Sequence, residues 1–99
     1  MNILEYLNDK NIEELYLASN FFDRLRGLLG KRGSNFDEDK ALLISPCNSI
    51  HTLFMKRPID IAFVSCDGEV LKIKEHVYPQ KLCIKHKKAC AVIESFSKI

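Results

Sequence analysis

The sequence predicts a mainly β fold: a small antiparallel β-barrel or sandwich, jelly-roll-like, with one short α-helix at about residues 21–29. The strongest evidence is a hairpin pattern in the middle of the chain. Residues 59–64 form a nearly continuous apolar run, and residues 69–74 alternate between apolar and polar side chains, as a half-buried strand does. Asp67-Gly68 lies between them and favours a type I′ turn, because glycine readily accepts a positive φ.

The chain is expected to form a single domain over residues 1–99. Its 99 residues are 46% apolar, which is enough for one modest core. The net charge of +2 is small for a dedicated nucleic-acid binder. No segment reaches the length of a membrane span, and the first ten residues contain acidic side chains but no apolar run. We therefore expect a cytoplasmic protein that binds no nucleic acid and does not insert into membranes.

The N-terminal segment fits two kinds of local structure. Residues 3–7 and 12–18 are expected to pair as a hairpin around the turn formers at residues 8–11. A short helix over residues 12–17 is the alternative, because its apolar side chains also fit helical spacing.

The clearest helical pattern follows, over residues 21–29. Ser19 or Asn20 supplies an N-cap, and Gly30 is a natural residue just past the C-terminal end. One apolar face is formed by Phe21, Phe22, Leu25, Leu28 and Leu29.

Short strands and polar loops account for the rest of the chain. The apolar runs at residues 41–44, 51–55 and 89–93 are expected to be strands. Residues 33–40 form a loop with an acidic cluster, and residues 81–88 form a basic loop.

The four cysteines are expected to be reduced thiols, and disulfide bonds are the less favoured alternative. Cys47, Cys66, Cys83 and Cys90 include no C-x-x-C pair, and structural zinc sites normally pair ligands across such a short spacing. Reduced cysteines pack as small apolar groups in proteins that remain in the cytosol. The sequence therefore predicts no bound metal or other cofactor.

Several blocks of sequence resemble the domain-of-unknown-function 192 family over roughly residues 15–94. These blocks are R-L-R-G-L-L, A-L-L-I, P-C-N-S-I-H-T-L-F-M-K, P-I-D-I-A-F and D-G-E-V-L-K-I. The resemblance implies a compact β-barrel or sandwich with one helix after the first strand. It implies no particular reaction, because the family has none established. Some members accompany secretion or pilus systems, so the resemblance is compatible with a protein partner.

The favoured function is a non-enzymatic binding or accessory module. A small barrel of this kind would present one set of polar side chains near one end of its central strands. The candidate binding residues are His51, Thr52, Lys56, Arg57 and Asp60.

A small hydrolase-type enzyme is the alternative. Cys47 would be its nucleophile, His51 the base, and Asp60 the carboxylate that orients the base. An extended chain from Cys47 to His51 spans about 13 Å, so only a tight turn could bring the thiol and the imidazole into contact. We therefore assign no catalytic residue.

Two further hypotheses are weaker. A metal site built from His51, His76 or His86 with a cysteine has no recognisable ligand spacing. A nucleic-acid patch at residues 81–88 contains no aromatic side chain for base stacking, which favours a solvated loop.

Asp60 is the one charged residue inside the apolar run of residues 59–64. In a strand it shares a face with Ala62 and Val64, so we expect it to be at least partly buried. A buried carboxylate needs partners, and these would lower its pKa. The expected partners are backbone N–H groups of the bend at residues 56–58, or a cation supplied by Lys56, Arg57 or His51.

Overall fold

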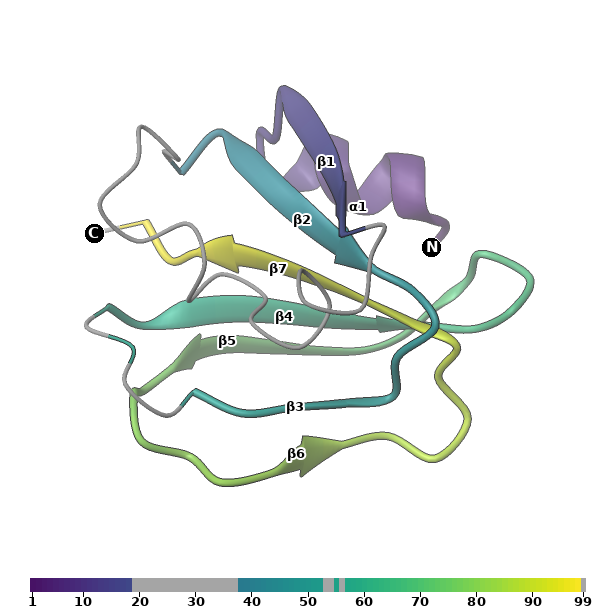
Figure 1. The fold of residues 1–99 in the computed structure, drawn as a ribbon. Helices are drawn as coiled ribbons and strands as arrows, with labels where there is room; N and C mark the ends of the chain where they lie inside the picture. The colour runs from purple at the N-terminus through teal and green to yellow at the C-terminus, as the bar shows by residue number, and fades with distance from the viewer. Residues whose placement is uncertain (19–37, 53–54, 56, 99) are drawn as a thin grey trace.

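The computed structural model describes residues 1–18, 38–52, 55 and 57–98, and these residues include one helix and seven strands (Figure 1). In chain order the elements are α1 (Ile3–Asp9), β1 (Glu14–Ala18), β2 (Lys40–Ile44), β3 (Ser49–Ile50), β4 (Ile59–Val64), β5 (Val70–Val77), β6 (Ile84–Lys85) and β7 (Ala91–Phe96). The expected helix at residues 21–29 lies outside the described residues.

The described strands form two sheets. The larger sheet has the strand order β1-β2-β7-β4-β5, and β3 pairs with β6 in a two-stranded ribbon. The mainly β prediction is confirmed. The large sheet is open and does not close into a barrel. It is also a mixed sheet, because β1 and β2 are parallel, whereas the pairs β2–β7, β7–β4 and β4–β5 are antiparallel.

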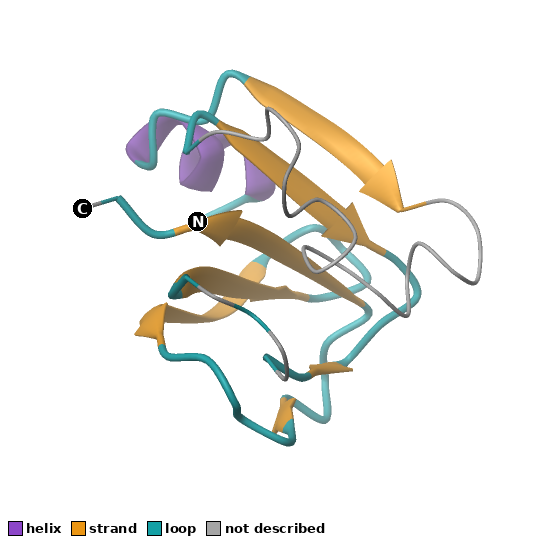
Figure 2. Ribbon diagram, turned by 60° about the vertical axis from the view of Figure 1, so that its left-hand side comes forward, coloured by secondary structure: helices purple, strands orange, loops and turns teal. Residues whose placement is uncertain are grey.

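The large sheet separates two apolar cores. On one side, which we call the helix side, Tyr6 of α1 packs with Ala62 and Val64 of β4. On the other, which we call the ribbon side, Ile61 and Phe63 pack with residues of the β3–β6 ribbon and its loops. Figure 2 shows α1 and the β3–β6 ribbon on opposite sides of the sheet. Because β4 and β7 are covered on both faces, every residue of both strands is buried, which explains the continuous apolar run.

The predicted N-terminal hairpin is wrong, and so is the alternative helix over residues 12–17. Residues 3–9 form α1, which begins with a capping box between Asn2 and Glu5. The turn formers after it end a helix rather than join two strands, and Asn11 adopts φ 56°, a left-handed conformation common at helix ends. The chain then enters β1, which pairs with β2 instead of with residues 3–7.

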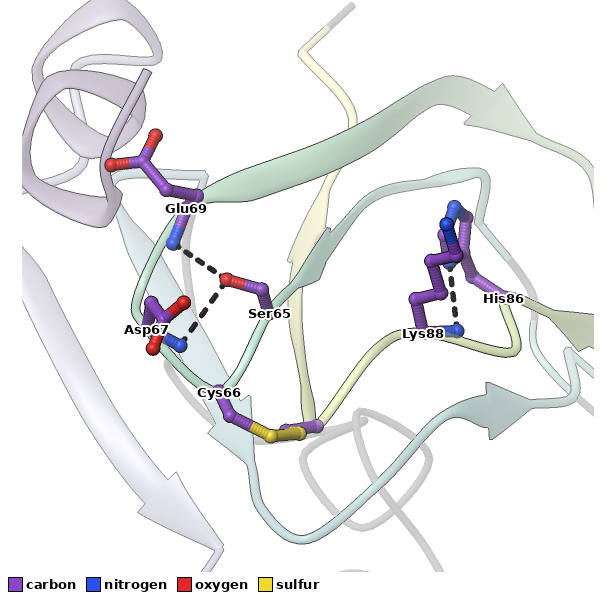
Figure 3. The surroundings of a disulfide bond; sticks show 7 residues. Ser65, Cys66, Asp67, Glu69, His86 and Lys88 are labelled. Carbon is purple, nitrogen blue, oxygen red and sulfur yellow. Dashed lines mark hydrogen bonds between the residues drawn. A yellow bond between two sulfur atoms is a disulfide. The ribbon is translucent and has the colours of Figure 1, made fainter.

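The β4–β5 hairpin is confirmed, but its turn is not of type I′. A type I′ turn needs two residues with positive φ, and in this turn only Gly68 (φ 85°) has one. The loop is closed by Ser65, whose N–H donates to the Glu69 carbonyl at 2.8 Å. Its Oγ also accepts hydrogen bonds from the N–H groups of Asp67 and Glu69 (Figure 3).

The prediction of four reduced thiols is wrong, because Cys66 and Cys90 form a disulfide (Figure 3). Cys66 follows β4, and Cys90 precedes β7. These strands are antiparallel with Val64 opposite Ala91, so the two cysteines meet at the same end of the sheet. Their Cα atoms are 5.1 Å apart, within the range that a disulfide requires. Cysteine spacing alone does not reveal this strand register. Cys47 and Cys83 are not part of a disulfide bond.

Candidate binding site

Asp60 lies at the centre of a polar network that joins α1, β4 and β5. It faces the helix side with Ala62 and Val64, as the strand alternation predicted, and only 6% of its surface is exposed. Its Oδ1 accepts hydrogen bonds from the His76 N–H at 3.0 Å and from the Ser97 hydroxyl at 2.7 Å. Its Oδ2 lies 3.1 Å from Nζ of Lys10. The carboxylate is therefore fully engaged within the fold.

A β-bulge in β5 brings the His76 amide to this carboxylate. Ile59 pairs with Val77 and Ile61 with Lys74, so two residues of β5 lie opposite the single residue Asp60. His76, the second of these two, has φ 51°, an uncommon conformation for a residue other than glycine. Its N–H donates to the Asp60 side chain. Bulges of this kind often redirect side chains next to functional sites.

Lys10 joins three parts of the chain at this network. It follows α1, and its Nζ contacts both Asp60 of β4 and the Glu75 carboxylate of β5. Its backbone carbonyl accepts a hydrogen bond from Nζ of Lys98 at 2.7 Å. The Lys10 side chain thus links the end of α1 to β4 and β5 by ion pairs, and a hydrogen bond from Lys98 links it to the residues after β7.

Both members of the central ion pair remain charged at neutral pH. Burial raises the pKa of Asp60, but hydrogen bonds from His76, Ser97 and Lys10 outweigh this effect and leave the pKa below its usual value. Burial lowers the pKa of Lys10, but hydrogen bonds to Glu75 and Asp60 outweigh it and raise the pKa. The predicted lowering of the Asp60 pKa is confirmed.

The partners predicted for Asp60 are wrong. Among the described residues the partners of the carboxylate are His76, Ser97 and Lys10, rather than Arg57, His51 or the described part of the bend, and Lys56 lies outside the described residues. Lys10 lies 50 residues away in sequence, and periodicity within one strand carries no information about a contact at that separation.

A pocket of about 200 Å³ opens beside this network, between the end of α1, the β5 bulge and the end of β7. Four carboxylates and two lysines line it, so negative charge is in excess. The lining residues are Asp9, Lys10, Asn11, Ile12, Glu38, Asp60, Glu75, His76, Ser95, Phe96 and Lys98.

Arg57 contacts two residues of the pocket wall. Its guanidinium lies 3.0 Å from Oε1 of Glu38 and 4.4 Å above the ring centre of Phe96. Of the predicted binding residues, Asp60 therefore lines the pocket and Arg57 supports its wall.

The other predicted binding residues do not line this pocket. Thr52 is 1% exposed, and its hydroxyl donates to the Tyr78 carbonyl while it accepts from the Lys81 N–H. It therefore fixes the loop between β5 and β6. His51 is half-buried, and Lys56 lies outside the described residues.

The proposed hydrolase arrangement is not assembled. Cys47 packs against the ribbon-side core, and its thiol donates to the Ser49 carbonyl at 3.1 Å. Asp60 faces the other side of the sheet, where its oxygens are already occupied, so it cannot orient His51. In the described ranges, no group of three or more His, Cys, Asp or Glu side chains is arranged to hold a metal ion.

Sequence reasoning missed most of the residues that build the pocket. The predicted strand over residues 69–74 ends before Glu75 and His76, and neither residue is connected to Asp60 by a sequence pattern. One signal was present. Ile3, Tyr6, Leu7 and Lys10 follow helical spacing, so a helical reading of this segment would have placed Lys10 on the face that covers the sheet.

Comparison with known proteins identifies the family. A family model described as "Uncharacterized ACR" matches residues 5–97. The chain belongs to the DUF192 family. This DUF192 chain matches no curated protein. In its described part, no helix is both long enough and apolar enough to cross a bilayer.

Two solved structures are similar to this DUF192 protein. A protein of unknown function from Novosphingobium aromaticivorans DSM 12444 is 19% identical with a TM-score of 0.69, over 84% of this chain and 62% of that one. A protein described as a "putative transcription regulator" from Sinorhizobium meliloti 1021 is 21% identical with a TM-score of 0.69, over 84% of this chain and 67% of that one. At these identities the similarity establishes the fold alone.

Proposed function

We propose that the protein is a non-enzymatic binding module that accepts a positively charged side chain of a partner protein in the Asp60 pocket. The observation that carries the proposal is the pocket itself, in which carboxylates outnumber ammonium groups four to two. Its location at the end of α1 adds to this excess, because the C-terminal end of a helix carries partial negative charge.

Two ammonium groups of the protein itself bind to acceptors in the pocket, and these acceptors are of the kind that the cation of a ligand would need. Lys10 lies between two carboxylates, and Lys98 donates to a backbone carbonyl at the end of the helix. Asp9 forms no ion pair with any described residue, and the Glu75 side chain is 57% exposed. These two carboxylates can therefore accept hydrogen bonds from a further cation.

The size of the pocket favours a side chain over a complete small molecule. Pockets for drug-sized ligands occupy about 300–1,000 Å³. A pocket of about 200 Å³ suits the end of a lysine or arginine side chain instead.

The test is an NMR titration of the ¹⁵N-labelled protein with N-acetyl-arginine amide and N-acetyl-lysine amide. We expect millimolar binding, with shifts at the amides of residues 10–12, 75–76 and 96–98. N-acetyl-citrulline amide has nearly the same shape as the arginine probe without its charge, and it should cause no shift. Putrescine is titrated in a separate experiment. If this diamine binds more tightly than the two amino-acid amides, the ligands are free small amines rather than side chains of a protein.

Charge variants provide the matched control. Glu75→Gln should weaken the arginine probe severalfold, whereas Glu69→Gln, at the β4–β5 turn and outside the pocket, should not change it. Equal shifts with the citrulline and arginine probes would overturn the proposal, as would shifts confined to residues outside the pocket.

A further inference from the structure

A lysine-rich surface lies on the ribbon side of the molecule, away from the pocket. Residues 70–93 contain six lysines but only one acidic residue, Glu75, which pairs with Lys10. None of the six forms an ion pair with a residue in the described part of the chain. We call this set the lysine surface: Lys72, Lys74, Lys81, Lys85, Lys87 and Lys88.

Strand register and ring packing bring these lysines together. Lys72 lies opposite Phe63, and Lys74 lies opposite Ile61, so both share the ribbon side with these core residues. The His86 ring is 5.8 Å from the Phe63 ring, which places the loop after β6 beside Lys72. Figure 1 shows β5, β3 and β6 together at one end of the molecule, with α1 at the other. The lysines therefore belong to one end of the fold.

Two large apolar side chains project from the same end. Tyr78 is 67% exposed and Leu82 is 78% exposed, and both lie in the loop between β5 and β6, on either side of Lys81. The loop is held in place by Thr52, whose hydroxyl bonds to the Tyr78 carbonyl and the Lys81 N–H. The fold thus keeps these apolar groups in solvent near lysines that form no ion pair with any residue that the structure describes.

We propose that the lysine surface binds an anionic lipid bilayer, with Tyr78 and Leu82 entering the interfacial layer. Lysines near such a surface gain energy from its negative potential without needing a fixed geometry. Tyrosine is enriched at the level of the lipid headgroups, and leucine gains from apolar contact there. A nucleic acid fits less well, because residues 70–93 contain no arginine for bidentate contacts and Leu82 would find no apolar phase.

Co-sedimentation with vesicles tests the charge component. The protein should bind vesicles of phosphatidylcholine mixed with phosphatidylserine, and should not bind phosphatidylcholine alone. Raising the salt from about 0.1 M to about 1 M should release it, because the Debye length falls from about 10 Å to about 3 Å. Each Lys→Gln change at residues 85, 87 and 88 should weaken partitioning about fivefold, which corresponds to about 1 kcal/mol per lysine. Lys40→Gln, outside this surface, should have no such effect.

A tryptophan probe tests the insertion of the loop. The protein contains no tryptophan, so Leu82→Trp reports from one position. Its emission should shift to the blue with phosphatidylserine vesicles. Leu4→Trp provides a control on α1, where the leucine is 67% exposed on the opposite side of the sheet. Equal partitioning to both kinds of vesicle would overturn the proposal, as would a blue shift of both probes, no binding at all, or salt-sensitive binding to duplex DNA or RNA without binding to vesicles.

Discussion

Removing the Asp60 carboxylate should destabilise the fold by roughly 2–4 kcal/mol. Three donors lose their acceptor in Asp60→Ala, and a hydrogen bond to a charged group contributes about 1.5–3 kcal/mol. The losses do not add in full. Lys10 keeps Glu75, so its charge stays compensated, and the Ser97 hydroxyl can rotate toward another acceptor. The His76 amide, fixed by the bulge, is the donor that stays unsatisfied.

Asp60→Asn should cost about 1–2 kcal/mol, because the amide oxygen can still accept from His76 and Ser97. The amide nitrogen then faces the Lys10 ammonium, and that contact is lost. Urea melts at neutral pH give the free energy of unfolding for both variants. Asp67→Asn is the control, since it makes the same chemical change at an exposed position. If Asp60→Ala unfolds at the same urea concentration as the parent, the network does not stabilise the fold and the reasoning is refuted.

The pH dependence provides a second test of the same network. Because the pKa of Asp60 is lower in the folded state than the unfolded value of about 3.9, its stabilisation is present above that value. It is lost as the pH falls through the folded pKa. The stability difference between the parent and Asp60→Asn should therefore be constant near neutral pH and shrink below about pH 4. A difference that persists undiminished in acid would show that charge contributes nothing.

Three further changes test other parts of the structure. Tyr6→Phe removes a buried hydroxyl that has no hydrogen-bond partner in the described structure, so stability should stay unchanged or rise by up to about 1 kcal/mol in urea melts. Thiol titration of the denatured, unreduced protein should count two thiols, and Cys90→Ser should cost about 3.5 kcal/mol, as expected for opening a loop between cysteines that are 24 residues apart. Thr52→Val should cost roughly 1–3 kcal/mol and speed hydrogen exchange at residues 78–83, since the Lys81 N–H loses its acceptor.

Local patterns in the sequence predicted the features that depend on the alternation within one strand, although not the type of the turn that follows β4. The β4–β5 hairpin, the face occupied by Asp60 and the lowered pKa of its carboxylate all follow from alternation and from the cost of burying a charge. The N-terminal segment was misassigned because its turn formers suit both a hairpin and the end of a helix. The disulfide and the Lys10 contact depend on strand register and on a helix crossing the sheet, which no single segment encodes.

The Asp60 network separates stability from binding in a way that variants can resolve. Both carboxylate oxygens of Asp60 accept hydrogen bonds from groups of the protein. Asp60 therefore shapes the pocket, but neither of its oxygens is available to a ligand. In the described part of the chain Glu75 pairs with Lys10 alone, and its side chain is 57% exposed, so it can bind a ligand at little cost to the fold. Removing the carboxylate of Asp60 should therefore lower stability and distort the pocket, whereas removing that of Glu75 should mainly weaken ligand binding. A network of this kind uses the buried carboxylate to position the exposed one.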